Sequence, residues 1–360
     1  MIRPATGLLL GMAAVAAVVL GQPALLEAWL TGFLLFAGLS AGALGVLAVG
    51  QLLREDWLAP VRAPLEAAAL AMPLVAIMAL PVLLGLDALY PWAGPVPPPM
   101  PEPRAAWLSP TPFRLRMIAI LALWIGLAWL LARQARPDRR LAGAVLAAMV
   151  TSVTIAAQDW SLSRDPGWWG SLQGFAVWVE GMMAALAAAA LVTLARGRMP
   201  GGETGPGEAA ERGLLALGLA TIWLWFVQFI TVWMADLPAE AAWYLRRVED
   251  GWGVLKLGVA VPALLLGLAL AAPPRHRPWR MAAVCLLLLL GHVAHLWWVV
   301  RPDAPLPLPN LALDAAVLAV LGPCWAAWWL SGLRRDAGAH GPTPAEADPA
   351  AVRPARGTAH

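Results

Sequence analysis

The sequence predicts an all-α polytopic membrane protein with about ten transmembrane helices. Its 360 residues are 60% hydrophobic and 13% charged, and the mean hydropathy is +0.68. A soluble domain has about 45–50% apolar and about 25% charged residues, so the composition excludes a soluble globule. A transmembrane helix needs about 20 apolar residues, and apolar runs of about that length follow one another along the whole chain.

Hydropathy along the chain sets the predicted spans. The first five are expected at Ala5–Gly21, Ala24–Leu53, Pro64–Leu86, Phe113–Leu131 and Leu141–Trp160. The second five are expected at Trp168–Arg196, Gly213–Asp236, Trp252–Ala272, Trp279–Val300 and Asn310–Ser331. The first run resembles a signal peptide in charge and length, but no small-x-small cleavage site follows it, so we count it as a span.

The arginines predict the orientation of these spans. With an even number of spans both termini lie on one side, and that side carries 17 arginines in its loops and tails against 7 on the other. Positive residues concentrate in cytoplasmic loops, so both termini are expected in the cytoplasm.

Two long connections and a tail divide the chain. Residues 87–112 carry nine prolines and are expected to form a semi-rigid extracytoplasmic strap, because polyproline is stiff. Residues 197–212 are rich in glycine and are expected in the cytoplasm. The tail, residues 334–360, is too poor in apolar residues to fold alone.

Composition also excludes several functions. The basic residues, 24 arginines and Lys256, lie mostly in short loops and form no cationic face, so nucleic-acid binding is not expected. We interpret the shortage of lysine as genomic codon bias.

Cys285 and Cys324 stand alone, which excludes iron–sulfur or c-type haem attachment. His292 and His295 lie one turn apart on the same span, so they cannot ligate one haem from opposite sides. No cofactor bound by this chain is predicted.

Polar residues at membrane depth are the candidates for function, since an ionisable group at mid-span costs about 2.5–3.5 kcal/mol. Glu180 is the deepest ionisable group, and Gln173 lies seven residues away on its face. Spans five, seven and nine carry further polar residues in their outer halves. The candidates for a proton path or a quinone pocket are Glu180, Gln173, Asp159, Gln158, Gln228, His292, His295 and Asp236.

This pattern is one-sided. The predicted inner halves are nearly all Ala, Leu, Val and Gly, and Glu66 is the main exception. A transporter needs polar groups that continue to both sides, or broken helices that meet at the midplane. The asymmetry favours a site open to the extracytoplasmic face, and a quinol head group would suit it, because acceptors take its protons and aromatic rings pack on its ring.

Structural readings compete with the functional one. Thr154, Thr221 and Thr231 can hydrogen-bond neighbouring helices with no other role. Carboxylates at span ends can be helix caps, and Glu180 can be a neutral acid bonded to a carbonyl or to Gln173. Most of the 21 tryptophans are expected in interfacial belts, and none is assigned to the site.

Two segments resemble a known family. Residues 159–172 read DWSLSRDPGWWGSL, and residues 223–253 read WLWFVQFITVWMADLPAEAAWYLRRVEDGWG. Together they resemble the shorter of the two NrfD-like, quinone-binding-type membrane subunits of alternative complex III, a quinol:cytochrome c oxidoreductase. Shorter matching pieces include LPVLLGLDALYPWA at residues 80–93 and HLWWVVRP at residues 295–302.

The resemblance implies an architecture and partners in a bacterial inner membrane. A peripheral helix (1–23) would precede a four-helix bundle (24–160), and a second four-helix bundle (161–300) would precede a last helix (301–333). The partners would be an NrfD-like sister membrane subunit, an iron–sulfur periplasmic subunit, and multihaem and monohaem cytochromes c. The sequence departs from the family pattern after span five, where Asp165-Pro166-Gly167-Trp168 lacks a histidine, and near the end of span nine, where His295 replaces an aspartate.

Three functions remain as hypotheses. The first is a cofactor-free membrane subunit of such a complex that scaffolds its redox partners and provides a proton path or a secondary quinone pocket. The second is a small-solute membrane transporter. The third is a purely structural membrane anchor whose polar groups only join helices.

Overall fold

The protein is described from a computed structural model, in which residues 15–16, 18–53, 58–132, 134, 138–168, 170, 172–199, 205–272, 277–304 and 311–339 are placed. These residues form helices and connecting turns, and nine helices among them are long and apolar enough to cross a membrane. The predicted all-α, multi-pass membrane fold is therefore confirmed. Of the predicted first span, Ala5–Gly21, only residues 15–16 and 18–21 are described.

The first group of helices runs from residue 23 to residue 164. Its members are α2 (Pro23–Leu53), α3 (Ala59–Ala69), α4 (Met72–Met78), α5 (Leu80–Leu84), α8 (Pro110–Ala132), α9 (Arg139–Trp160) and the 3-10 turn η3 (Leu162–Arg164). The apolar run expected as a span at 64–86 lies in one candidate span, Ala59–Leu84, which is divided into α3, α4 and α5, and both breaks precede a helix with proline in its first turn. Proline lacks the N–H that would continue the preceding helix, so each one starts a new helix.

The proline-rich connection, expected as a semi-rigid strap, contains short helical segments. It contains α6 (Leu86–Leu89), the 3-10 turn η2 (Pro91–Ala93) and α7 (Glu102–Trp107). Trp92 Nε1 donates to Ser163 Oγ at 3.1 Å, and Tyr90 Oη donates to the Trp160 carbonyl at 2.9 Å. The connection is thereby fixed to the end of α9, because its aromatic residues donate hydrogen bonds that polyproline alone would not make.

The second group runs from residue 173 to residue 303. Its members are α10 (Gln173–Ala195), α11 (Pro206–Ala235), α12 (Pro238–Arg246), η4 (Glu249–Gly251), the π-helix η5 (Val254–Ala260), α13 (Val261–Ala271), α14 (Pro278–Val300) and η6 (Arg301–Asp303). Helix α11 begins seven residues before the predicted span and buries Glu208 and Glu211. The expectation of an almost purely apolar inner half is wrong at this helix, because both acids fell in a segment expected to be loop.

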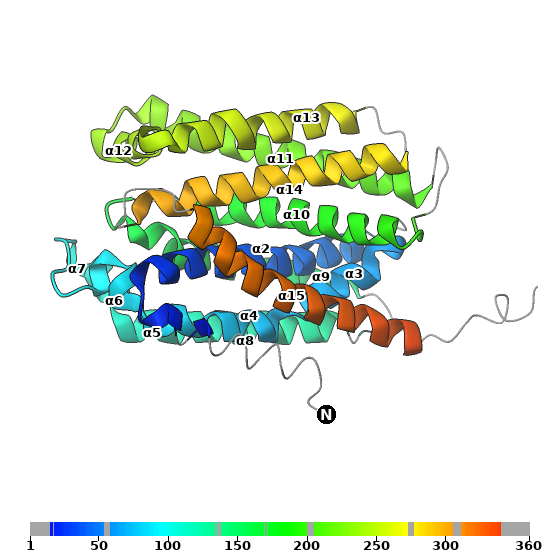
Figure 1. Ribbon diagram of the computed structural model, residues 1–360, viewed down its shortest axis with the longest axis horizontal. Coiled ribbons are helices and arrows are strands. Elements are labelled where there is room, and N and C mark those ends of the chain that lie inside the picture. Colours follow the sequence, from blue (N-terminus) through cyan, green and yellow to red (C-terminus); the bar gives the residue numbers. More distant parts are fainter. Residues whose placement is uncertain are drawn as a thin grey trace, which may run out of the picture.

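The two groups lie side by side with their long helices roughly parallel, and α15 (Leu311–Ala339) runs obliquely across them (Figure 1). The most extensive contact between the groups is that of α2 with α10, and α15 packs on α2 and α3. Glycine makes the close approach possible: a methyl carbon at Gly42 would lie 2.1 Å from the carbonyl oxygen of Gly181. The contact between these two helices forms the centre of the core.

We use "outer end" for the end of the molecule where α9 ends and α10 begins. Arginine counting predicts this end to be extracytoplasmic.

Candidate functional site

The carboxylate of Glu180 is held between two imidazoles inside the second group. Glu180 lies on α10, and His292 and His295 lie three residues apart on α14, so they share one face of that helix. His292 Nδ1 is 2.9 Å from Glu180 Oε1, and His295 Nδ1 is 2.6 Å from Oε2. Each imidazole therefore binds a different oxygen of the same carboxylate.

The site is buried. Residue exposure is 2% for Glu180, 3% for His292 and 5% for His295. An ionised carboxylate only accepts hydrogen bonds, so each Nδ1 that binds it carries the proton, and Nε2 of a neutral ring is then the atom that can take up another. His292 Nε2 has no hydrogen-bond partner among the described residues. The arrangement thus contains a buried imidazole whose Nε2 is hydrogen-bonded to none of the described residues.

A tryptophan and a lysine complete the cluster. Trp225, on α11, donates its Nε1–H to Glu180 Oε2 at 3.2 Å, and its ring centroid is 4.0 Å from that of His295. Lys256 Nζ lies 3.2 Å from the Trp225 ring centroid and 4.9 Å from that of Trp298. We call Glu180, His292, His295, Trp225 and Lys256 the Glu180 cluster.

Four elements of the second group, α10, α11, η5 and α14, contribute to this cluster at a similar depth. Glu180 is seven residues from the first residue of α10, His295 is five from the last residue of α14, and Trp225 is ten from the last residue of α11. At 1.5 Å rise per residue these positions lie roughly 7–15 Å from the outer end. The cluster therefore occupies the outer half of the bundle.

Lys256 is carried by the π-helix η5, Val254–Ala260. A π-helix is rare and often marks functional sites, because its wider turn changes the direction in which side chains project. Here it precedes α13 in the same span and places the only lysine of the chain over an indole ring.

Lys256 and Trp225 were not among the residues predicted for the site. The shortage of lysine is explained by codon bias in the sequence-based interpretation, which expects most tryptophans in interfacial belts. The sequence did carry a signal for Lys256: in a chain with 24 arginines, the one lysine falls at the start of an apolar span. The sequence carries a weaker signal for Trp225, which lies beside the polar stripe of Thr221, Gln228 and Thr231, but its contact with Glu180 depends on which face of α11 turns toward α10.

The other candidates of the second group take different positions. Gln173 is buried at the first turn of α10, and Gln228 is half-buried on α11. Asp236 is exposed and ends α11 in the left-handed conformation, with φ of 49°. Thr221 and Thr231 donate to carbonyls of their own helix. Asp236 is therefore a helix terminator that lies apart from the Glu180 cluster.

Asp159 and Gln158 belong to a separate site in the first group. Asp159 accepts hydrogen bonds from Arg116 Nε at 2.7 Å and from Trp107 Nε1 at 2.8 Å, and the Arg116 guanidinium lies 4.0 Å from the Trp107 ring. Gln158 Nε2 donates to the Gly170 carbonyl at 2.6 Å. The two candidates line a mostly apolar cavity of about 400 Å³ between α7 and α9.

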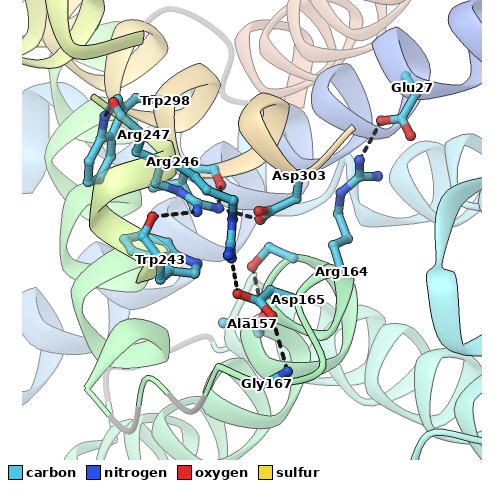
Figure 2. A network of polar contacts seen from close by, with 12 residues as sticks. Glu27, Ala157, Arg164, Asp165, Gly167, Trp243, Arg246, Arg247, Trp298 and Asp303 are labelled. Atoms are coloured by element: carbon cyan, nitrogen blue, oxygen red, sulfur yellow. Dashed lines mark hydrogen bonds and ion pairs between the residues drawn. The ribbon is translucent and has the colours of Figure 1, made fainter. Parts of the chain in front are cut away.

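A network of ion pairs joins the two groups at the outer end. Arg164, after α9, pairs with Glu27 of α2 at 2.8 Å, and Arg301 of η6 lies 3.8 Å from Glu27 and 3.3 Å from Asp314 of α15. Figure 2 shows Arg164 and Glu27 facing each other within the first group, and Arg301 supplies the contact from the second group. The side chains of Arg164 and Glu27 are fully buried. We call Glu27, Arg164, Arg301 and Asp314 the Glu27 network.

Arg247 fixes the neighbouring connection in the same region (Figure 2). It pairs with Asp303, donates to the Val299 carbonyl at 2.8 Å, and lies 3.5 Å from the Trp243 ring centroid. Burial lowers the pKa of Arg247 to about 10, and the attraction of Asp303 opposes that shift. Burial likewise raises the pKa of Tyr244 above its usual range. These groups are tightly packed and serve to hold the α12 segment against α14.

Metal ligation is not visible in the described part of the chain. Within it, no group of three or more His, Cys, Asp or Glu side chains is placed to hold a metal ion. Cys285 and Cys324 are buried and are not joined in a disulfide.

Comparison of the sequence with known families and curated proteins found no match. No model of a known protein family matches the sequence, and a search of curated proteins finds no significant match.

Proposed function

We propose that this chain is the smaller NrfD-like membrane subunit of a quinol:cytochrome c oxidoreductase of the alternative complex III type. In this proposal it lies in a bacterial inner membrane with both termini in the cytoplasm. It scaffolds an NrfD-like sister subunit, an iron–sulfur subunit, and multihaem and monohaem cytochromes c. The chain itself binds no redox cofactor, and its Glu180 cluster accepts protons that quinol oxidation releases.

The observation that carries the proton role is the pairing of Glu180 with two histidines. Quinol oxidation releases two protons with its two electrons, so groups that exchange protons near neutral pH are needed close to the outer side. Histidine is the side chain whose ordinary pKa is nearest to neutrality. Glu180 and two histidines form a buried set, His292 and His295 being joined to the carboxylate by contacts of 2.9 and 2.6 Å.

The cavity beside Gln158 supports a secondary quinone pocket. Its walls include Trp107, Leu108 and Ile155, which suit a flat apolar ring. The Gln158 amide nitrogen is used by Gly170, which leaves its oxygen to accept a hydroxyl proton of a quinol. Ligand pockets typically have about 300–1,000 Å³, and this cavity of about 400 Å³ falls in that range.

The identity proposal is tested by composition. The full chain, tagged and purified from membranes of its native host in mild detergent, should carry covalent haem and an iron–sulfur signal in fixed ratio to the chain. It should also oxidise a quinol analogue with cytochrome c as acceptor. A preparation that is free of haem and inactive with quinol, yet intact by size, would overturn the assignment.

The proton role is tested by Glu180→Gln in that complex. The amide keeps the size of the side chain and removes its negative charge, so we expect assembly to persist and quinol oxidation to slow by at least about tenfold. Glu66→Gln is the matched control, because Glu66 pairs with Arg62 four residues away on α3, outside the cluster. Equal rates in the two variants would contradict the role.

A further inference from the structure

Among the described residues, Lys256 is the only lysine or arginine in the Glu180 cluster. Along the whole of α10, Gln173–Ala195, Glu180 is the only ionisable residue, and along α2, Pro23–Leu53, it is Glu27. Helix α13 has no charged residue, and the acids and arginine of α11 lie in its first two turns. On α14, Arg280 lies at the opposite end from His292 and His295.

Several arginines beyond the outer end are already paired with acids. Arg247 pairs with Asp303, and Arg246 pairs with Asp165. Glu27 has Arg164 at 2.8 Å. The Glu180 carboxylate, with no arginine bonded to it, therefore depends on Lys256 or on a protonated histidine for a positive counter-charge.

The indole of Trp225 joins the two charges. Its ring face holds the Lys256 ammonium at 3.2 Å, and its N–H edge donates to Glu180 Oε2, also at 3.2 Å. A cation on the ring face withdraws electrons and strengthens the N–H as a donor, and an anion at the N–H strengthens the cation–π attraction. Each contact thus reinforces the other, so that ammonium and carboxylate act as a pair across one ring.

We propose that Lys256 is a positioning residue that sets the number of protons held by the Glu180 cluster. Its ammonium balances the charge of ionised Glu180 through Trp225, so that His292 and His295 rest as neutral imidazoles with Nε2 ready to accept. Without this cation the cluster retains one more proton at rest, on an imidazole or on the carboxylate. It can then accept one proton fewer. This refines the proton-accepting role proposed above, but its test needs neither quinol nor a partner protein.

The test is nitrogen NMR of the full chain in liposomes with ¹⁵N-labelled histidine. The chain has five histidines, and the signals of His292 and His295 are assigned by their loss in the corresponding asparagine variants. In wild type at pH 7 we expect both rings to be neutral. In Lys256→Met we expect the protonated population of the cluster to rise on the order of tenfold, because an opposite charge at this range shifts protonation by that factor or more.

The added proton can also reside on Glu180, and infrared absorption of a protonated carboxylic acid, assigned by its loss in Glu180→Gln, detects it there. Lys256→Arg should restore the wild-type spectra, because it restores the positive charge. Leu257→Met is the matched control, since Leu257 is the exposed neighbour on the same π-helix.

Two results would overturn the proposal. One is an imidazolium signal from His292 or His295 in wild type at pH 7, a measurement that requires no variant to fold. The other is a folded Lys256→Met chain whose histidine and carboxyl spectra both match wild type. Neither result would bear on membership in the oxidoreductase, which the haem and iron–sulfur content tests separately.

Discussion

Two buried glutamates near the outer end have opposite surroundings. Glu27 faces the guanidinium of Arg164 at 2.8 Å and has Arg301 at 3.8 Å. Glu180 faces His292 and His295 at 2.9 and 2.6 Å. Both acids are almost fully buried, at 0% and 2% exposure, so burial alone does not separate them.

The partner residue decides what each glutamate can do. Arginine does not give up its proton in proteins, so the arginines of the Glu27 network keep their charge and favour the ionised form of the acids that they hold. Histidine, unlike arginine, can take up and release a proton, so the Glu180 cluster contains side chains that can change its charge. We therefore assign structure to the Glu27 network and proton chemistry to the Glu180 cluster.

The largest expected effect is on the Glu27 network. Arg164→Met leaves Glu27 buried and without its nearest counter-charge, which should lower the free energy of unfolding by about 3–5 kcal/mol. Denaturant unfolding of the purified chain in mixed micelles measures this. Arg246→Met is the control, since Arg246 is 44% exposed in its pair with Asp165 and should cost less than about 1 kcal/mol.

The double variant Glu27→Gln with Arg164→Met tests whether the loss of stability in Arg164→Met comes from the unpaired Glu27 carboxylate. Removing both charges should recover a large part of the lost stability, because the penalty comes from the unpaired carboxylate and not from the missing contact. Equal stabilities of Arg164→Met and wild type would show that the Arg164–Glu27 pair does not stabilise the first helix group.

The next effect concerns the glycine contact between α2 and α10, which brings the two helix groups together independently of charge. Gly42→Ala places a methyl 2.1 Å from the Gly181 carbonyl oxygen and should cost about 1–3 kcal/mol in unfolding free energy. Gly38→Ala, one turn earlier on α2, meets nothing within 4 Å and should be neutral or stabilising. If both variants unfold alike, the helices are not as close as described.

A smaller loss is expected in the Glu180 cluster itself. Glu180→Gln keeps an oxygen that can accept from His292 or Trp225, so we expect about 1 kcal/mol of destabilisation, well below that of Arg164→Met. The same unfolding assay compares the two variants directly. A loss as large as that of Arg164→Met would place Glu180 among the structural acids.

The smallest effect is expected at Asp236, a candidate that the structure separates from the cluster. Its φ of 49° is left-handed, so Asp236→Ala should cost about 1 kcal/mol, while Asp236→Gly should change stability by less than about 0.5 kcal/mol. Quinol oxidation should be unchanged in both variants. A loss of activity in Asp236→Gly would return this residue to the site.

Most of the fold could be predicted from the sequence, because transmembrane helices are defined by long apolar runs. The predicted span at 24–53 agrees with α2 within one residue, and that at 279–300 agrees with α14 within one residue. The predicted span boundaries differ from the observed helices where the local composition does not match the structure. Helix α11 continues through Glu208 and Glu211 into a segment with loop-like composition, and prolines divide the span after α2 into α3, α4 and α5.

The site could be predicted only in part. Spacing along α14 placed His292 and His295 on one face, but their pairing with Glu180, more than 100 residues away, depends on the rotation of two helices about their axes. Asp159 and Gln158 shared the outer half with Glu180, yet they belong to the other helix group, where Arg116 holds Asp159. The depth of a residue in the membrane can be predicted from the sequence. The helix face from which a polar side chain projects, and so the helix that it contacts, cannot be predicted when the rest of the helix is apolar.

The central claim, that the Glu180 cluster accepts protons while the Glu27 network does not, is tested most directly by proton release during quinol oxidation. The purified complex is reconstituted in liposomes, and a pH-sensitive dye on the outer side follows protons per quinol oxidised. Glu180→Gln should delay or reduce this release, whereas Glu27→Gln, in complexes that assemble, should release protons as wild type does. Wild-type proton release from Glu180→Gln at an unchanged rate of quinol oxidation would contradict the account.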